Sequence, residues 1–171
     1  MERSTEAIEE TRMPLAGRPR VPAEYGIETS DSGLIPWTWA LEQLQAARNY
    51  WVCTASPDGQ PHAAPVWGVV LDRTLYFSTD TRSAKGRNLL ATGRVVVHLE
   101  SGDDVVILEG AVERFDRTDQ VPGLAIVYRE KYGIDVSKLP SAESAWFAFR
   151  PSLAHGWREA DFQKSATRWK F

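Results

Sequence analysis

The chain has 171 residues, 43% of them hydrophobic and 11% aromatic, which suits one folded domain with a substantial core and a tail. Its formal net charge of −3 at pH 7 gives no support to nucleic-acid binding. The single cysteine, Cys53, excludes an internal disulfide and paired-cysteine zinc or redox motifs. No apolar run is long enough to cross a membrane and no signal-peptide pattern opens the chain. We therefore expect a soluble, cytoplasmic protein without a nucleic-acid or membrane partner.

Residues 1–30 are predicted to be a disordered or extended N-terminal tail, because the opening is charged and Pro14, Pro19 and Pro22 interrupt any helix. Residues 31–171 are predicted to form the folded domain. A helix is expected from Pro36, since proline is favoured in a first turn and apolar residues then recur at helical spacing. These apolar residues are Trp37, Ala40, Leu41, Leu44 and Ala47.

After this helix the apolar pattern changes to one that is typical of strands. Strands are predicted at residues 50–55, 61–71, 75–79, 94–100, 105–115, 146–149, 151–157 and 166–171. The first three form an antiparallel meander. Helices are expected at 83–91 and 116–132, the second capped by Asp116 or Thr118 and ended by Gly133. Short antiparallel strands in this number favour a small barrel, a mainly β (α+β) fold with helices at its rim.

The segment that follows strand 75–79 has the composition of a phosphate-binding helix start. The first N–H groups of a helix lack intrahelical partners, and the helix dipole favours an anion there. Ser83 can cap this helix, and Lys85 and Arg87 can neutralise a phosphate. A capped surface helix with solvated basic side chains is the alternative that this segment alone leaves open.

Strand 61–71 carries Pro65 in its middle, with the small residues Ala63, Ala64 and Gly68 around it. Proline cannot donate to a β-ladder, so this strand is expected to be an edge or an irregular stretch. A planar heteroaromatic ring could lie against such a strand and form hydrogen bonds with its backbone. The alternative is a barrel edge with small residues at a bend.

Residues 51–67, 75–79 and 83–89 together resemble the pyridoxamine 5'-phosphate oxidase-like superfamily, and within it the flavin/deazaflavin oxidoreductase group B. The resemblance covers roughly residues 36–171. It implies a split β-barrel of roughly six to eight antiparallel strands with short peripheral helices. It also implies a homodimer that binds FMN or coenzyme F-420 at the subunit interface. The implied cofactor-binding residues are Ala64, Pro65, Val66, Trp67, Ser78, Thr79, Ser83, Lys85, Arg87 and Asn88.

The chain departs from the true pyridoxamine phosphate oxidases at two places. Ala84 stands where they carry an arginine before the lysine, and their C-terminal Arg-Leu-His-Asp-Arg substrate motif is absent. Oxidation of vitamin B6 is therefore not expected. Trp157 and Arg168 have approximately the separation of the tryptophan and arginine that approach the flavin in the oxidases, and they are the predicted substrate-binding residues.

A flavin-type cofactor carries the hydride chemistry itself, so no catalytic side chain is predicted. No metal site is predicted either, because His62, His98 and His155 lie far apart without other ligands at metal-binding spacing. We expect an enzyme that uses reduced coenzyme F-420 to transfer a hydride to an unsaturated small molecule. An FMN-binding oxidoreductase is the first alternative. A cofactor-binding or carrier protein without turnover is the second.

Overall fold

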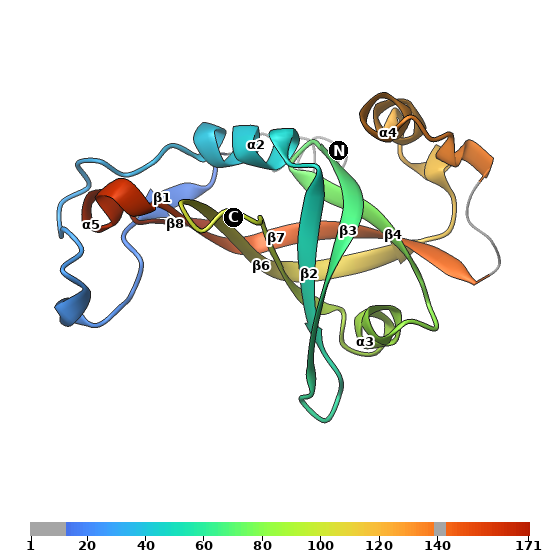
Figure 1. The fold of residues 1–171 in the computed structure, drawn as a ribbon, viewed down its shortest axis with the longest axis horizontal. Coiled ribbons are helices and arrows are strands. Elements are labelled where there is room, and N and C mark those ends of the chain that lie inside the picture. Colours follow the sequence, from blue (N-terminus) through green and yellow to red (C-terminus); the bar gives the residue numbers. More distant parts are fainter. Residues whose placement is uncertain (1–12, 139–142) are drawn as a thin grey trace, which may run out of the picture.

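Six antiparallel strands close into a barrel in the computed structural model, which describes residues 13–138 and 143–171 (Figure 1). Around the barrel their order is β7, β4, β3, β2, β5 and β6, and the pairing of β6 with β7 closes the ring. The strands are β2 (Asn49–Ala55), β3 (Pro61–Leu71), β4 (Thr74–Asp80), β5 (Arg94–His98), β6 (Asp104–Phe115) and β7 (Ser144–Arg158). The predicted antiparallel barrel and the meander of β2, β3 and β4 are confirmed.

Strand β7 is continuous, so the prediction of two separate strands at 146–149 and 151–157 is wrong. Pro151 lies opposite Gly110 of β6, where the register shifts between Glu109 and Gly110. A Cβ atom on Gly110 would overlap the carbonyl oxygen of Arg150, so glycine permits the close approach of the two strands. The irregularity accommodates a proline that would otherwise end the strand.

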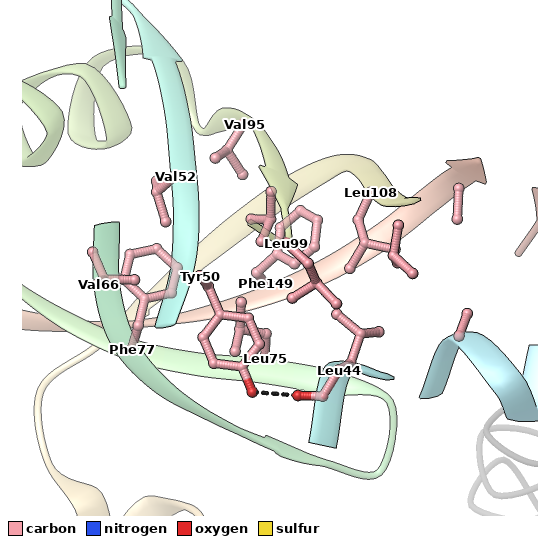
Figure 2. Close-up of a cluster of buried hydrophobic side chains, with 14 of the residues drawn as sticks. Leu44, Tyr50, Val52, Val66, Leu75, Phe77, Val95, Leu99, Leu108 and Phe149 are labelled. Atoms are coloured by element: carbon pink, nitrogen blue, oxygen red, sulfur yellow. Dashed lines mark hydrogen bonds between the residues drawn. The ribbon is translucent and has the colours of Figure 1, made fainter. Parts of the chain in front are cut away.

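Alternate side chains of the strands point into the barrel and form its core. Tyr50 and Val52 of β2 and Phe77 of β4 are buried there (Figure 2). Helix α2 (Trp37–Ala46) packs on the same cluster. The Tyr50 hydroxyl donates a 2.6 Å hydrogen bond to the carbonyl oxygen of Leu44, which ties the end of α2 to β2 (Figure 2).

A second apolar cluster lies outside the barrel and includes helix α4 (Leu124–Tyr132). Its buried members are Val69, Tyr76, Leu124, Tyr128, Val136, Trp146 and Ala148. The single helix predicted at 116–132 is wrong, because Gly123, with a φ of 83°, separates α4 from a preceding 3-10 helix, η2 (Thr118–Gln120). The backbone N–H groups of Asp116 and Arg117 donate to the Gln120 side chain, so the predicted Asp116 or Thr118 cap is not formed. Gly133 ends α4 as predicted.

The N-terminal segment is attached to the C-terminal end of the chain. Strand β1 (Leu15–Gly17) pairs with β8 (Thr167–Lys170), which pairs with β7, so the sheet extends beyond the barrel. Arg18 donates hydrogen bonds to four backbone carbonyl groups, those of Ser30, Ser32, Lys164 and Ala166. Residues 1–12 of the predicted tail lie outside the described residues, and the domain boundary at residue 31 stays a prediction. Within the described part of that tail, β1 belongs to the same sheet as the barrel.

The remaining helices are α3 (Ala84–Thr92), α5 (Phe162–Ser165) and three 3-10 helices, η1 (Ala23–Tyr25), η3 (Val136–Lys138) and η4 (Glu159–Asp161). Within residues 13–138 and 143–171, no helix combines the length and the apolar character that crossing a membrane requires.

Candidate functional site

The wall of the barrel opens between β3 and β4. Residues 61–67 of β3 pair with β2, and only residues 68–71 pair with β4. Beyond that point, Ser78 to Asp80 of β4 pair with β7. Among the described residues, one side of β3 therefore has no strand partner from Pro61 to Trp67. Pro65 lies in this stretch, where a missing N–H is tolerated, as the sequence predicted.

Helix α3 begins beside this opening and packs against β2, β3 and β4. Ser83 caps it as predicted, because its hydroxyl oxygen accepts a 3.1 Å hydrogen bond from the Gly86 N–H. The same hydroxyl donates to the Asp80 carbonyl oxygen at 2.7 Å and lies 3.3 Å from the Thr79 hydroxyl. A Cβ atom on Gly86 would overlap the Asp80 carbonyl oxygen, so only glycine lets the first turn approach β4 this closely.

The three basic side chains at the start of α3 have different environments. The Arg82 guanidinium pairs with Asp80 at 2.7 Å and with Glu143 at 2.6 Å. Hydrogen bonds from Arg82 hold the pKa of the Asp80 carboxyl at about 2. Arg87 is exposed and donates to the Arg82 carbonyl oxygen. Lys85 is half-buried, and burial lowers the pKa of its ammonium group while Asp80 opposes that shift. Among the described residues, Lys85 alone of these three has no hydrogen-bond or ion-pair partner for its side chain.

Two other predicted cofactor-binding residues of this region face elsewhere. Asn88 is buried, and its side-chain amide donates a 3.0 Å hydrogen bond to the Thr54 hydroxyl, which ties α3 to β2. Ser78 lies on the same face of β4 as Tyr76, whose ring belongs to the cluster that includes α4. Thr79, by contrast, lies on the opposite face beside Ser83. The structure therefore brings Thr79, Ser83 and Lys85 together, and it separates Ser78 and Asn88 from them.

The four predicted residues of β3 alternate across the sheet. Val66 is buried in the barrel core, and Ala64 is half-buried on the same face. Pro65 and Trp67 point outward, and Trp67 is 39% exposed. Any contact of Val66 with a ligand outside the barrel is therefore a backbone contact.

Trp67 belongs to an aromatic and basic group that the sequence did not predict. Its ring stacks on the Tyr132 ring of α4, with centroids 4.7 Å apart and an interplanar angle of 9°. The Arg48 guanidinium lies 5.6 Å from the centre of the Trp67 ring. The Gly68 N–H donates a 2.9 Å hydrogen bond to the Tyr132 hydroxyl, so α4 fixes β3 at the residue next to Trp67.

Lys131 completes this attachment of α4 to the barrel. Its ammonium group donates to the Tyr50 hydroxyl at 2.8 Å and to the Gly68 carbonyl oxygen at 3.0 Å. Burial lowers the pKa of Lys131 to about 8, and burial followed by the proximity of Tyr132 raises the pKa of Tyr50. These bonds join residues 63 or more positions apart in the chain, so no local sequence signal predicts them.

Trp157 and Arg168 lie on one face of the sheet, on β7 and β8. Arg168 is directly opposite His155, and Trp157 follows His155 by two residues on the same face. The Trp157 ring makes an edge-to-face contact with Phe162 at 5.7 Å. Figure 1 shows β8 and α3 well apart in the molecule. Within one chain the structure therefore does not bring these two residues to the opening beside α3.

The family of the chain follows from comparison with known proteins. The family model described as pyridoxamine 5'-phosphate oxidase matches residues 40–158, which is more than half of the chain. The protein therefore belongs to this family, and its barrel is the split β-barrel that the resemblance implied. No curated protein sequence gives a match.

Three solved structures illustrate the range of proteins with this fold. One, described as an F420 reductase, is 22% identical, with a TM-score of 0.52 over 66% of this chain and 94% of its own. A pyridoxamine 5'-phosphate oxidase-related, FMN-binding protein from Nostoc punctiforme is 16% identical, with a TM-score of 0.55 over 81% and 97%. HutZ from Vibrio cholerae, described as a heme storage protein, is 14% identical, with a TM-score of 0.58 over 67% and 88%. At these identities the likeness concerns the fold.

Proposed function

We propose that the protein is an oxidoreductase that uses reduced coenzyme F-420 to transfer a hydride to an unsaturated small molecule. The observation that carries this proposal is the opening between β3 and β4. There, within residues 13–138 and 143–171, a strand edge without a pairing strand lies beside the capped start of α3 and beside Lys85, whose side chain has no hydrogen-bond or ion-pair partner. A cofactor with a planar ring and a phosphate needs both a backbone edge and an anion site.

The residues divide the binding between ring and phosphate. The first N–H groups of α3 and the Lys85 ammonium would hold the phosphate, because charge and helix dipole both favour an anion there. The backbone of residues 64–67 would pair with the polar edge of the ring, and Trp67, fixed by Tyr132, would flank it. When bound, the cofactor supplies the hydride; the protein orients it and excludes water.

F-420 is preferred over FMN because of the resemblance to the deazaflavin-dependent group, and the similar fold of an F420 reductase supports this choice. FMN is the alternative, supported by the FMN-binding protein of the same fold. Dialysis of the purified protein against equal concentrations of the two cofactors, followed by absorbance and mass measurements, separates the two. Retention of F-420 is the expected result. If the protein retains FMN alone, FMN replaces F-420 as the proposed cofactor. If it retains neither cofactor, both proposed enzyme functions are refuted.

A carrier without turnover is the remaining alternative, and the fold shared with a heme storage protein is consistent with it. The distinguishing measurement is the oxidation of bound, reduced F-420 after a conjugated carbonyl compound is added. A rate above that of free cofactor supports the oxidoreductase. Tight cofactor binding with no acceleration across a panel of such acceptors would favour the carrier.

We further propose that the protein is a homodimer with a cofactor site at each end of the interface. The outward face of β2, β5, β6 and β7 carries half-buried apolar side chains outside both apolar clusters of the described residues. They are Trp51, Val96, Ile107 and Leu153. Cross-strand pairing places these side chains in two adjacent rows that run across the strands. One row is Trp51, His98 and Ile107, on β2, β5 and β6. The other is Val96, Glu109 and Leu153, on β5, β6 and β7. A second copy would bury this face.

A further inference from the structure

Arg168 is a half-buried cation without a partner. Its guanidinium makes no hydrogen bond or ion pair with any described residue, and its Nε atom is buried. Other arginines near it are engaged: Arg18 binds four carbonyl groups and Arg158 pairs with Asp161 at 2.7 Å. Buried N–H groups are almost always satisfied in folded proteins, so an unsatisfied one calls for a ligand or bound solvent.

The groups around Arg168 suit an anion with a flat body. His155 lies directly opposite it on β7, and the His155 Nδ1 atom is 3.7 Å from a carboxylate oxygen of Glu109 on β6. With Nδ1 turned toward Glu109, the other ring nitrogen faces away from that carboxylate. Trp157 adds an apolar ring on the same sheet face. The charged groups that face His155 from the neighbouring strands are Glu109 on β6 and Arg168 and Lys170 on β8.

We propose that Arg168 and His155, on β8 and β7 at the edge of the face that the proposed dimer would bury, together bind the carboxylate of a substrate whose flat apolar part packs against Trp157. The guanidinium offers two parallel N–H donors that match a carboxylate, and the imidazole offers a further donor. The proposal rests on the proposed function, because it names an unsaturated carboxylic acid as the class of hydride acceptor. Glu109 acts as a positioning residue that holds the imidazole ring.

This arrangement makes carboxylate binding depend on pH. Burial and Arg168 hold the pKa of His155 below its usual value, and Glu109 opposes that shift. His155 is therefore mainly neutral near neutral pH when the site is empty. A bound carboxylate neutralises Arg168, which favours the protonated imidazole, so binding takes up a proton. Affinity for a carboxylate should rise as the pH falls from about 7.5 to about 5.5, a range that spans the ordinary histidine pKa.

The test uses benzoate as the probe and benzamide as its uncharged counterpart. Binding is followed through the imidazole NMR signals of the three histidines, with His155→Gln identifying the signal of His155. Benzoate should raise the pKa of His155, and benzamide should not.

Arg168→Gln should lower the affinity for benzoate about ten-fold or more, as expected for the loss of a charge-assisted pair. His155→Gln should remove the pH dependence. Arg158→Gln, which breaks an exposed ion pair at the end of the neighbouring strand β7, is the matched control and should bind benzoate as the wild type does.

Equal affinities for benzoate and benzamide would overturn the carboxylate site. So would an Arg168→Gln variant that loses F-420 or FMN as severely as Lys85→Ala, because Arg168 would then hold the cofactor. A third result would also contradict the proposal: an Arg168→Gln variant that no longer dimerises but binds benzoate as tightly as the wild type. The partner of the Arg168 guanidinium would then belong to a second copy of the chain. Cofactor binding is measured on the same samples. If the expected benzoate pattern appears in a protein that binds neither cofactor, the proposed function fails and the carboxylate site stands.

Discussion

Three basic residues within six positions of one another, Arg82, Lys85 and Arg87, have separate roles that charge alone does not reveal. Arg82 is neutralised by two carboxylates, and Arg87 is exposed and bonded to the backbone. Lys85 is half-buried and has no hydrogen-bond or ion-pair partner within the described part of the chain. Burying an unpaired cation is unfavourable, and an anion at the same place removes that cost. We therefore expect an anion such as the cofactor's phosphate to bind beside this side chain.

Replacing Lys85 tests this explanation at the level of one residue. Lys85→Ala removes a charge-assisted bond worth about 1.5–3 kcal/mol, so affinity for F-420 or FMN should fall ten-fold or more. Arg87→Ala is the control and should change affinity less than about three-fold, since its guanidinium is engaged with the backbone at the surface. Fluorescence titration of both folded variants measures the difference. Equal losses, or no loss in Lys85→Ala, would contradict the placement.

Lys131 gives a pH-dependent prediction of stability. Its pKa is about 8 in the folded protein, below the ordinary lysine value, because burial disfavours the charge. Between about pH 8 and about pH 10 the unfolded chain binds more protons at this residue, so the free energy of unfolding should rise with pH there. The raised pKa values of Tyr50 and Tyr128 have the opposite effect only at higher pH, as the unfolded tyrosines ionise.

Denaturant unfolding of the wild type and of Lys131→Met at several pH values checks this effect. Lys131→Met leaves the Tyr50 hydroxyl and the Gly68 carbonyl without their donor and should cost about 1–3 kcal/mol near neutral pH. The stability difference between the two proteins should widen from about pH 8 to about pH 10, because only the wild type gains. A difference that stays constant over this range would show that Lys131 does not titrate there.

At the level of elements, the contact between α3 and β4 sets the geometry of the candidate site. Gly86→Ala should force the first turn of α3 away from Asp80, with a loss of about 1–3 kcal/mol of stability from overpacking. Cofactor affinity should fall as well, because Ser83 and Lys85 move with the turn. Gly102→Ala is the matched control, since a Cβ atom there meets nothing within 4 Å and its φ is not positive. Unfolding and titration of both variants measure the contrast, and identical behaviour would rule out the tight packing.

The elements that depend on local chemistry were predictable, and those that depend on distant contacts were not. Pro65 indicated an edge in β3, and Ser83 indicated the cap of α3, because each acts through its own backbone. The continuity of β7 through Pro151 depends on Gly110 of β6, which local reading of β7 does not include. The break before α4 follows Pro122 and Gly123, residues typical of a turn, which the prediction of one helix over 116–132 did not take into account.

For the whole molecule, the separation of α3 from β8 is the central fact. The opening beside Lys85 has a strand edge and the capped start of α3, whereas β8, which carries Arg168, lies at a distance in the same chain (Figure 1). A second copy packed on the outward face of β2, β5, β6 and β7 would add residues of one chain to the site of the other. The cofactor would then bind more tightly to the dimer than to the monomer, because the dimer completes its site.

Ile107→Glu tests this arrangement, because it places a charge in the middle of the proposed interface, opposite His98 and His155. We expect the wild type to sediment as a dimer at about micromolar concentration and the variant as a monomer, since a charged side chain pressed between two largely apolar faces loses its hydration. Cofactor affinity should fall with the dimer although Lys85 is unchanged. Ile126→Glu is the control: this residue is 63% exposed on α4, away from the face, and its variant should remain dimeric and bind as the wild type does. A wild-type monomer that binds the cofactor tightly, or an Ile107→Glu dimer with full affinity, would show that the site is complete within one chain.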